Sequence, residues 1–167
     1  MKIQAHKFLG FLQGLDFQTR SVLLFGPDEA LLSAKADQVK QALSKNHKFD
    51  IELFTEEEIR KDPGLLESQP SLFGGGDSDK KVVLILNAKD RFMKTLEALD
   101  DVIFKDKILL FVSPGLATSS KIVKFHEANS DHYCIGIYEQ TPAENSPTRS
   151  QHRTHHRRGT ESDTSRA

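Results

Sequence analysis

The sequence predicts an α/β fold, a three-layer sandwich around a mainly parallel five-stranded sheet. Strand-like segments recur along the chain, and three of them are continuous apolar runs, as expected for strands covered on both faces. Amphipathic helical patterns separate these segments. Strands that alternate with helices favour a parallel sheet between two helical layers. We expect this organisation to fill one domain, residues 1–140.

Five segments have strand character. The second of them alternates apolar and polar residues instead of forming a continuous run, so we expect it at an edge of the sheet. In chain order the segments are 21–25 (SVLLF), 50–55 (DIELFT), 81–87 (KVVLILN), 107–112 (KILLFV) and 132–139 (HYCIGIYE).

Helical patterns fill the intervals between the strands. Thr55 precedes three glutamates, which indicates a helix with a capping residue and an acidic first turn. An amphipathic stretch, 6–15, comes before the first strand. The apolar stripes are Leu32, Ala36, Val39 and Leu43 in 28–45; Phe92, Leu96 and Leu99 in 88–103; and Ile122, Val123 and Phe125 in 119–128.

The composition is that of a water-soluble domain, with 37% hydrophobic and 28% charged residues. A formal net charge of -1 gives no reason to expect whole-surface attraction to nucleic acid or anionic lipid. The single cysteine, Cys134, excludes an internal disulfide framework and fits a reducing compartment. Apolar runs are far too short to cross a membrane, and the N-terminus is a poor secretory signal. We therefore expect a cytoplasmic protein with no membrane contact.

The composition changes near residue 140. From Thr141 onward there is no Val, Ile, Leu, Met, Phe or Tyr, so residues 141–167 are expected to form a disordered polar tail. Weak metal binding by His152, His155 and His156, or non-specific nucleic-acid contact by RTHHRR, is less favoured than a solvated tail.

The turn after the first strand resembles a phosphate-binding loop only in part. When G-x-x-x-x-G-K-[ST] is laid over it, Gly26 takes the first position and Ser33 the last. Leu31 stands where the second glycine belongs, and Leu32 stands where the lysine belongs. The apolar stripe directs Leu32 into the core. A functional phosphate loop is therefore not expected.

Charges around this turn also argue against a nucleotide. Asp28 and Glu29 begin the helix, where they cap it and repel a triphosphate. Asn87, not an acidic pair, follows the third strand, and Asp90 is better read as a helix-start residue. We expect no cofactor here.

Other catalytic chemistries are also disfavoured. Cys134 lies within a predicted strand, where a buried inert thiol is the commoner case. His126 and His132 flank it in sequence, but no third group in the sequence orients either ring. We predict no catalytic, metal-binding or cofactor-binding residues in this chain.

Residues 65–81 (LLESQPSLFGGGDSDKK) fit a plain scaffold less well. Pro70 restricts Gln69 to extended conformations, and Gly74–Gly76 free the backbone that follows. Leu72 and Phe73 lie between these elements. They either cover the core under a loop or protrude from it.

The order Gln69, Ser71, Leu72, Phe73 resembles the Q-x-[SD]-L-F peptide by which replication proteins bind the bacterial sliding clamp. SLFGG comes before basic residues and an apolar strand, and LLFGPDEALL opens the fold. Together these motifs resemble the N-terminal AAA+-like domain of the delta subunit of bacterial DNA polymerase III, a clamp-loader subunit. That family's domain has lost its phosphate loop. The resemblance covers roughly residues 1–140.

The resemblance implies a non-catalytic role in DNA replication. The domain would bind the ring-shaped clamp, the beta subunit, and hold one interface open so that DNA enters. Leu72 and Phe73 would form the wedge, and Gln69 and Ser71 would supply supporting contacts. Other clamp-loader subunits would bind and hydrolyse ATP, and contact with DNA would be indirect, through the assembly.

The sequence departs from the family near YEQTPAE, where a delta subunit continues into further helical domains. The corresponding expectation is that these C-terminal domains are missing, through a frameshift or a truncated gene model, which puts assembly into a loader in doubt. Two alternatives remain. One is a small-molecule or nucleotide-binding α/β enzyme that uses the crevice after the first strand. The other is a response-regulator-like domain, which is disfavoured because no acidic cluster ends a central strand.

Overall fold

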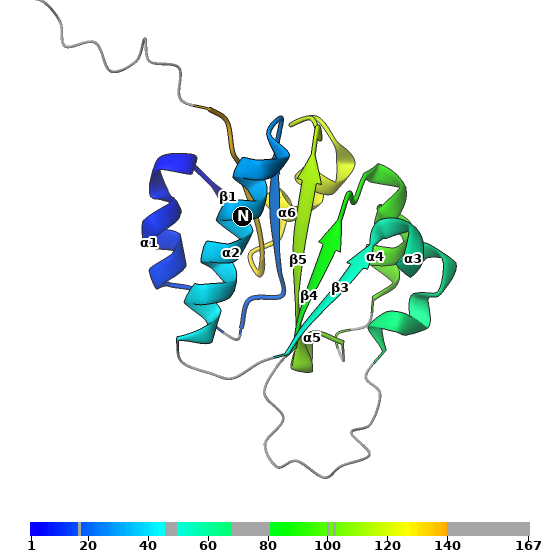
Figure 1. The fold of residues 1–167 in the computed structure, drawn as a ribbon. Coiled ribbons are helices and arrows are strands. Elements are labelled where there is room, and N and C mark those ends of the chain that lie inside the picture. The colour runs from blue at the N-terminus through cyan, green and yellow to red at the C-terminus, as the bar shows by residue number, and fades with distance from the viewer. Residues whose placement is uncertain (17, 46–49, 68–80, 100, 102, 140–167) are drawn as a thin grey trace, which may run out of the picture.

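The computed structural model describes residues 1–16, 18–45, 50–67, 81–99, 101 and 103–139 (Figure 1). Its centre is one parallel sheet of six strands in the order β1-β6-β2-β5-β4-β3. The strands are β1 (Lys2–Ile3), β2 (Ser21–Gly26), β3 (Ile51–Thr55), β4 (Lys81–Leu86), β5 (Lys107–Pro114) and β6 (His132–Gly136).

The parallel α/β sheet is confirmed, but the predicted number of five strands is wrong. The additional strand is β1, in which Lys2 and Ile3 pair with β6 opposite Cys134 and Ile135. Two residues are too few to produce a recognisable alternation in the sequence. The predicted edge position of the second strand-like segment is confirmed, because β3 ends the sheet.

Helices cover both faces of the sheet (Figure 1). One face carries α1 and α2, and the other carries α3 to α6. The α-helices are α1 (Phe8–Gln13), α2 (Glu29–Ser44), α3 (Glu56–Lys61), α4 (Met93–Ala98), α5 (Ile103–Asp106) and α6 (Lys121–Ala128). Within the described ranges, the short 3₁₀ helices are η1 (Ala5–Lys7), η2 (Pro63–Leu66) and η3 (Asp90–Phe92).

Alternation along the central strands builds one apolar core on each face. On β2, Val22 and Leu24 pack in the cluster under α2, whereas Leu23 and Phe25 pack in the cluster on the opposite face. All residues of β2 are buried. This double burial explains why the central strands are continuous apolar runs.

The predicted helical stripes are largely confirmed. The buried residues of α2 are the expected Leu32, Ala36, Val39 and Leu43. Thr55 caps α3 in a reciprocal arrangement with Glu58, whose backbone N–H donates to Thr55 Oγ1 at 3.3 Å. The segment 88–103 is not one helix, however, but η3, α4 and the start of α5.

Candidate functional site

The turn after β2 is filled by backbone. A Cβ built on Gly26 lies 1.9 Å from the carbonyl oxygen of Ile137, and Gly26 has a φ of 156°. The N–H of Ile137 donates to Phe25 O at 2.8 Å, and the N–H of Gly115 donates to Gly26 O at 2.8 Å. Close backbone packing therefore accounts for this glycine without any phosphate.

The start of α2 is capped by its own acid. Asp28 Oδ1 accepts a hydrogen bond from the backbone N–H of Leu31 at 3.0 Å, so this amide is already satisfied. Leu32 is fully buried, as predicted, and Leu31 is half-buried against the same core. The two positions at which a phosphate loop needs glycine and lysine serve helix packing here.

The loop after β4 likewise serves the scaffold. Asn87 has a φ of 61° and its N–H donates to Val112 O at 2.9 Å. Asp90 begins η3, which confirms its assignment as a helix-start residue. Its Oδ1 also accepts from the backbone N–H of Ile122 at 3.2 Å. Asp90 thus satisfies an amide in the first turn of α6, where Ser120 makes no side-chain cap.

An ion pair between the buried carboxylate of Glu56 and the exposed side chain of Arg91 connects α3 to the same loop. The side chain of Glu56 is 1% exposed, and its Oε1 lies 2.7 Å from Arg91 Nε. Its other oxygen accepts from the N–H of Lys89 at 3.2 Å. Sequence reasoning missed this pair because Glu56 stands among three glutamates that fit a solvated first turn. The pair holds two loops at the carboxyl edge of the sheet together.

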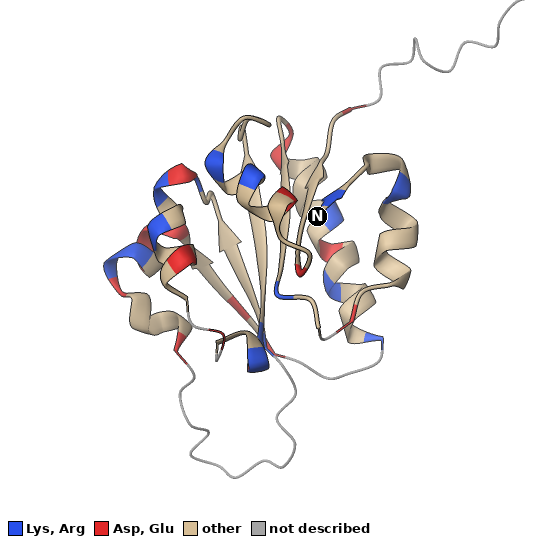
Figure 2. Cartoon of the chain, turned by 180° about the vertical axis from the view of Figure 1, so that it is seen from behind, with Lys and Arg blue, Asp and Glu red and all other residues tan. Residues whose placement is uncertain are grey.

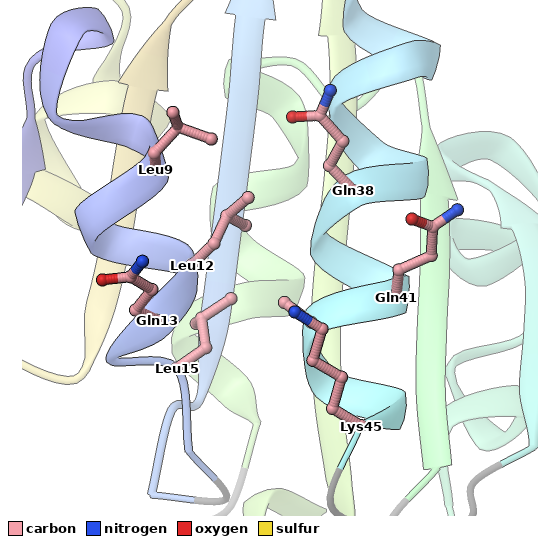
Figure 3. Close-up of a pocket in the computed structure, with 8 residues that line it drawn as sticks. Leu9, Leu12, Gln13, Leu15, Gln38, Gln41 and Lys45 are labelled. Atoms are coloured by element: carbon pink, nitrogen blue, oxygen red, sulfur yellow. The ribbon is translucent and has the colours of Figure 1, made fainter.

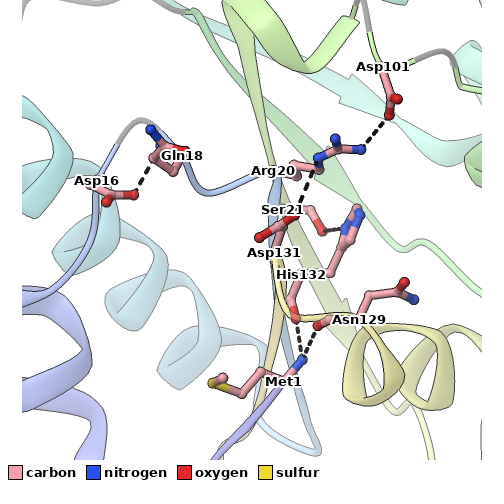
Figure 4. Close-up of polar contacts among 9 residues, drawn as sticks. All are labelled: Met1, Asp16, Gln18, Arg20, Ser21, Asp101, Asn129, Asp131 and His132. Carbon is pink, nitrogen blue, oxygen red and sulfur yellow. Dashed lines mark hydrogen bonds and ion pairs between the residues drawn. The ribbon is translucent and has the colours of Figure 1, made fainter.

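A buried cluster of His126, Ser21 and His132 lies at the start of β2, and Figure 4 shows its Ser21 and His132. Ser21 Oγ is 2.8 Å from His126 Nε2 and 2.6 Å from His132 Nδ1. His126 Nδ1 lies 2.8 Å from the carbonyl oxygen of Ile122 and donates to it, so Nε2 accepts from the serine hydroxyl. The serine then accepts from His132 Nδ1–H. In each of these contacts a donor therefore faces an acceptor.

Burial keeps both histidines neutral. Desolvation lowers the pKa of His126 to about 3 and that of His132 to about 4. The third group that the sequence did not reveal is Ser21, which orients both rings. Nearby, the N-terminal amine donates to the carbonyl oxygens of Asn129 and His132 (Figure 4), and also to that of His126.

This cluster does not activate the cysteine. Cys134 is 1% exposed, and burial raises the pKa of its thiol to about 11. A thiolate nucleophile needs the opposite shift and access to a substrate. Cys134 is therefore a core residue, as expected from its place in a strand.

The surface of the described residues carries several grooves. One, of about 430 Å³, lies between α1 and α2 and has Leu9, 71% exposed, at its rim (Figure 3). Its lining is apolar and amide-bearing apart from Lys45, so it offers no acid–base pair for catalysis. Residues lining it are Leu9, Leu12, Gln13, Leu15, Gln38, Gln41, Ala42 and Lys45.

The predicted clamp-binding residues Gln69, Ser71, Leu72 and Phe73 lie outside the described residues. The described residues on either side of them make contacts with the rest of the fold. Leu66, in η2, is fully buried in the core under α3.

On the other side, Lys81 opens β4, with its Nζ 3.1 Å from Glu52 Oε1. Glu67 and Lys81 line one groove of about 410 Å³. The described residues that flank this segment, Glu67 and Lys81, therefore lie near one another.

Among the residues that the structure describes, no group of three or more His, Cys, Asp or Glu side chains is placed to hold a metal ion. Within the same ranges, no helix is long and apolar enough to cross a membrane. Comparison with models of known protein families gave no match, and no curated protein matched the chain.

Proposed function

We propose that this chain is a non-catalytic clamp-binding module, similar to the AAA+-like domain of a clamp-loader delta subunit. Gln69, Ser71, Leu72 and Phe73 contact a sliding clamp and help to open its ring. The observation that carries the proposal is the order Gln-x-Ser-Leu-Phe in a chain with an α/β scaffold, whose turn between β2 and α2 lacks the residues of a phosphate loop.

The fixed ends of the segment support this role. Because Leu66 is anchored in the core and Lys81 is paired with Glu52, a load on the segment is transmitted to the sheet. A wedge that opens a ring needs such a base. The ends also meet at a groove that includes Phe54 and Leu65, which offers further apolar surface beside the segment.

Tight binding to a clamp requires this further apolar surface, because burial of two side chains gives only weak affinity. Burying a leucine and a phenylalanine contributes roughly 1.5–3 kcal/mol each. Together they give a dissociation constant of about 1 mM or slightly better. Ile51 and Leu53 on the edge strand are 48% and 59% exposed. Side chains alternate along a strand, so these two point to the face of β3 opposite to Glu52 and Phe54, which line the groove. They can therefore add contacts only to a clamp that reaches around this edge of the sheet.

A titration of the full chain with purified sliding clamp tests the proposal. We expect binding that Leu72→Ala with Phe73→Ala abolishes. The matched control, Leu9→Ala with Tyr138→Ala, removes two other exposed apolar side chains and should leave binding unchanged. Loss of binding in both pairs, or in neither, contradicts the assignment of the wedge.

The alternative is a nucleotide- or small-molecule-binding enzyme that uses the crevice after β2. The close approach of Ile137 to Gly26 and the capping of α2 by Asp28 disfavour it. A parallel titration with Mg-ATP separates the two functions. Binding of ATP that survives the Leu72 and Phe73 changes, without clamp association, favours the enzyme.

A further inference from the structure

The face of the molecule that carries α3, α4 and α6 has a basic groove of about 770 Å³. Five cationic side chains line it, against two carboxylates. On the face seen in Figure 2, lysine and arginine positions lie on α6 and on the helices beside it. The whole chain carries a formal charge of -1, so this groove is far more basic than the average surface.

Most of these cations are not neutralised. Arg91 is paired with Glu56, and Asp90 is engaged with the backbone of α6. Among the described residues, no carboxylate lies within 4 Å of the remaining four cationic groups. These four are Arg60, Lys94, Lys121 and Lys124.

The groove also has an apolar floor. Phe125 and Met93 line it, and both are half-buried. The ring of Phe125 is held edge-on against His132, with ring centroids 5.1 Å apart. Lys121, Lys124 and Phe125 follow a three- and four-residue spacing on α6, so they share one side of the helix. An exposed part of a fixed aromatic ring therefore lies beside two free ammonium groups.

We propose that this groove binds single-stranded nucleic acid. The four unpaired cations contact backbone phosphates, and a base packs on Phe125. Cations that follow a backbone beside an aromatic platform are the combination by which proteins bind single strands without sequence preference. An acidic peptide needs the charges but not the ring. The inference does not rest on clamp binding, because it uses none of the residues 69–73.

Fluorescence anisotropy of a labelled oligo(dT) of about 15 nucleotides tests the proposal on the full chain. Four phosphate contacts predict a slope of roughly -2.8 for the logarithm of the binding constant against the logarithm of salt concentration. Affinity should therefore fall roughly fiftyfold between about 50 and about 200 mM salt.

Charge reversal identifies the site. Lys121→Glu with Lys124→Glu should weaken binding at least about tenfold and reduce the salt slope by roughly 1.4. Glutamate in the first turn of α6 suits the helix dipole, so the variant should fold, which a thermal melt verifies. The control, Lys7→Glu with Lys45→Glu, makes the same change in net charge at exposed positions in η1 and at the C-terminal end of α2, away from the groove, and should bind as the parent does. Phe125→Leu should weaken binding severalfold without altering the salt slope.

Three results overturn the proposal. Equal weakening by the control pair means that only net charge matters. Unchanged binding by the Lys121 and Lys124 variant places the contact elsewhere, for example on the arginines of the segment 149–166. Displacement of oligo(dT) by poly-glutamate at equal charge concentration assigns the groove to an acidic protein.

Discussion

At the scale of single residues, two buried serines differ in whether their hydroxyl groups have hydrogen-bond partners. Ser21 is hydrogen-bonded to both His126 and His132, whereas Ser113 is 1% exposed and its Oγ has no hydrogen-bond partner among the described residues. Ser21→Ala should therefore reduce the free energy of unfolding by about 1–3 kcal/mol, because it leaves polar groups unpaired. Ser113→Ala should be neutral or stabilising. Urea denaturation of both variants measures the difference, and equal losses would contradict the hydrogen-bond assignment.

The two histidines should make stability depend on pH. Unfolded histidine titrates near 6.5, whereas the folded pKa values are about 3 for His126 and about 4 for His132. Below pH 6.5 the unfolded chain binds more protons than the folded protein does. The stability that the neutral histidines contribute is therefore fully present above pH 6.5 and is lost as the pH falls toward 4. Each histidine adds a slope of about 1.4 kcal/mol per pH unit.

His126→Gln isolates this effect. The slope of unfolding free energy between about pH 5 and about pH 6 should decrease by about 1.4 kcal/mol per unit. The control His6→Gln replaces an exposed histidine outside the Ser21 cluster, so a change of slope found only in the His126 variant is assigned to the cluster. An unchanged slope in the His126 variant means that this ring already carries a proton in the folded protein.

At the scale of elements, the packing of β2 against the chain after β6 requires glycine at position 26, and no ligand is needed to explain it. Gly26→Ala should destabilise the fold by at least about 3 kcal/mol, because its Cβ meets the backbone of Ile137 and its φ is strained for an L residue. Gly10→Ala in α1 has open space around the new methyl and should be neutral or stabilising by up to about 1 kcal/mol. Thermal melts compare the two. Tolerance of alanine at Gly26 would show that the loop after β6 is free to move aside.

The elements that periodicity predicted are those with a wide buried face. The stripe from Leu32 to Leu43 and the central strands could be recognised because every apolar position faces a core. Strand β1 escaped notice because two residues carry no period. The division of 88–103 into shorter helices also left no clear signal, since Phe92 and Leu96 keep helical spacing across the change from η3 to α4.

Interactions between elements were harder to predict than the elements themselves. Asp90 was correctly expected to start a helix, but its contact with Ile122 depends on how η3 and α6 pack. The same holds for Glu56 with Arg91, which are 35 positions apart in the chain. The residues Gln69 to Phe73 were found through their order in the sequence, and they lie outside the described residues.

At the scale of the whole molecule, the two proposed surfaces lie at opposite ends of the strands, one at their amino ends and the other at their carboxyl ends. Lys81 and Lys107 begin their strands and line the groove beside the proposed clamp-binding segment. Asp90 and Lys121 follow strands and line the basic groove. Substitutions at one surface should therefore leave the other unaffected.

The structure of the turn between β2 and α2 predicts that a nucleotide does not stabilise the protein against unfolding. Mg-ATP in large excess should leave the melting temperature unchanged, because the first turn of α2 is already capped and Leu32 is buried. A ligand present at 100 times its dissociation constant stabilises a fold by about 2.7 kcal/mol, which a melt readily detects. A clear upward shift would revive the enzyme alternative.

The central claim is that the order Gln-x-Ser-Leu-Phe binds a sliding clamp. Its most direct test is calorimetric titration of purified clamp with the parent chain and two variants. The parent and the Lys121→Glu, Lys124→Glu variant should bind alike, and Leu72→Ala with Phe73→Ala should give no heat of binding. Clamp binding that persists without Leu72 and Phe73, or no binding by the parent chain, would contradict the account.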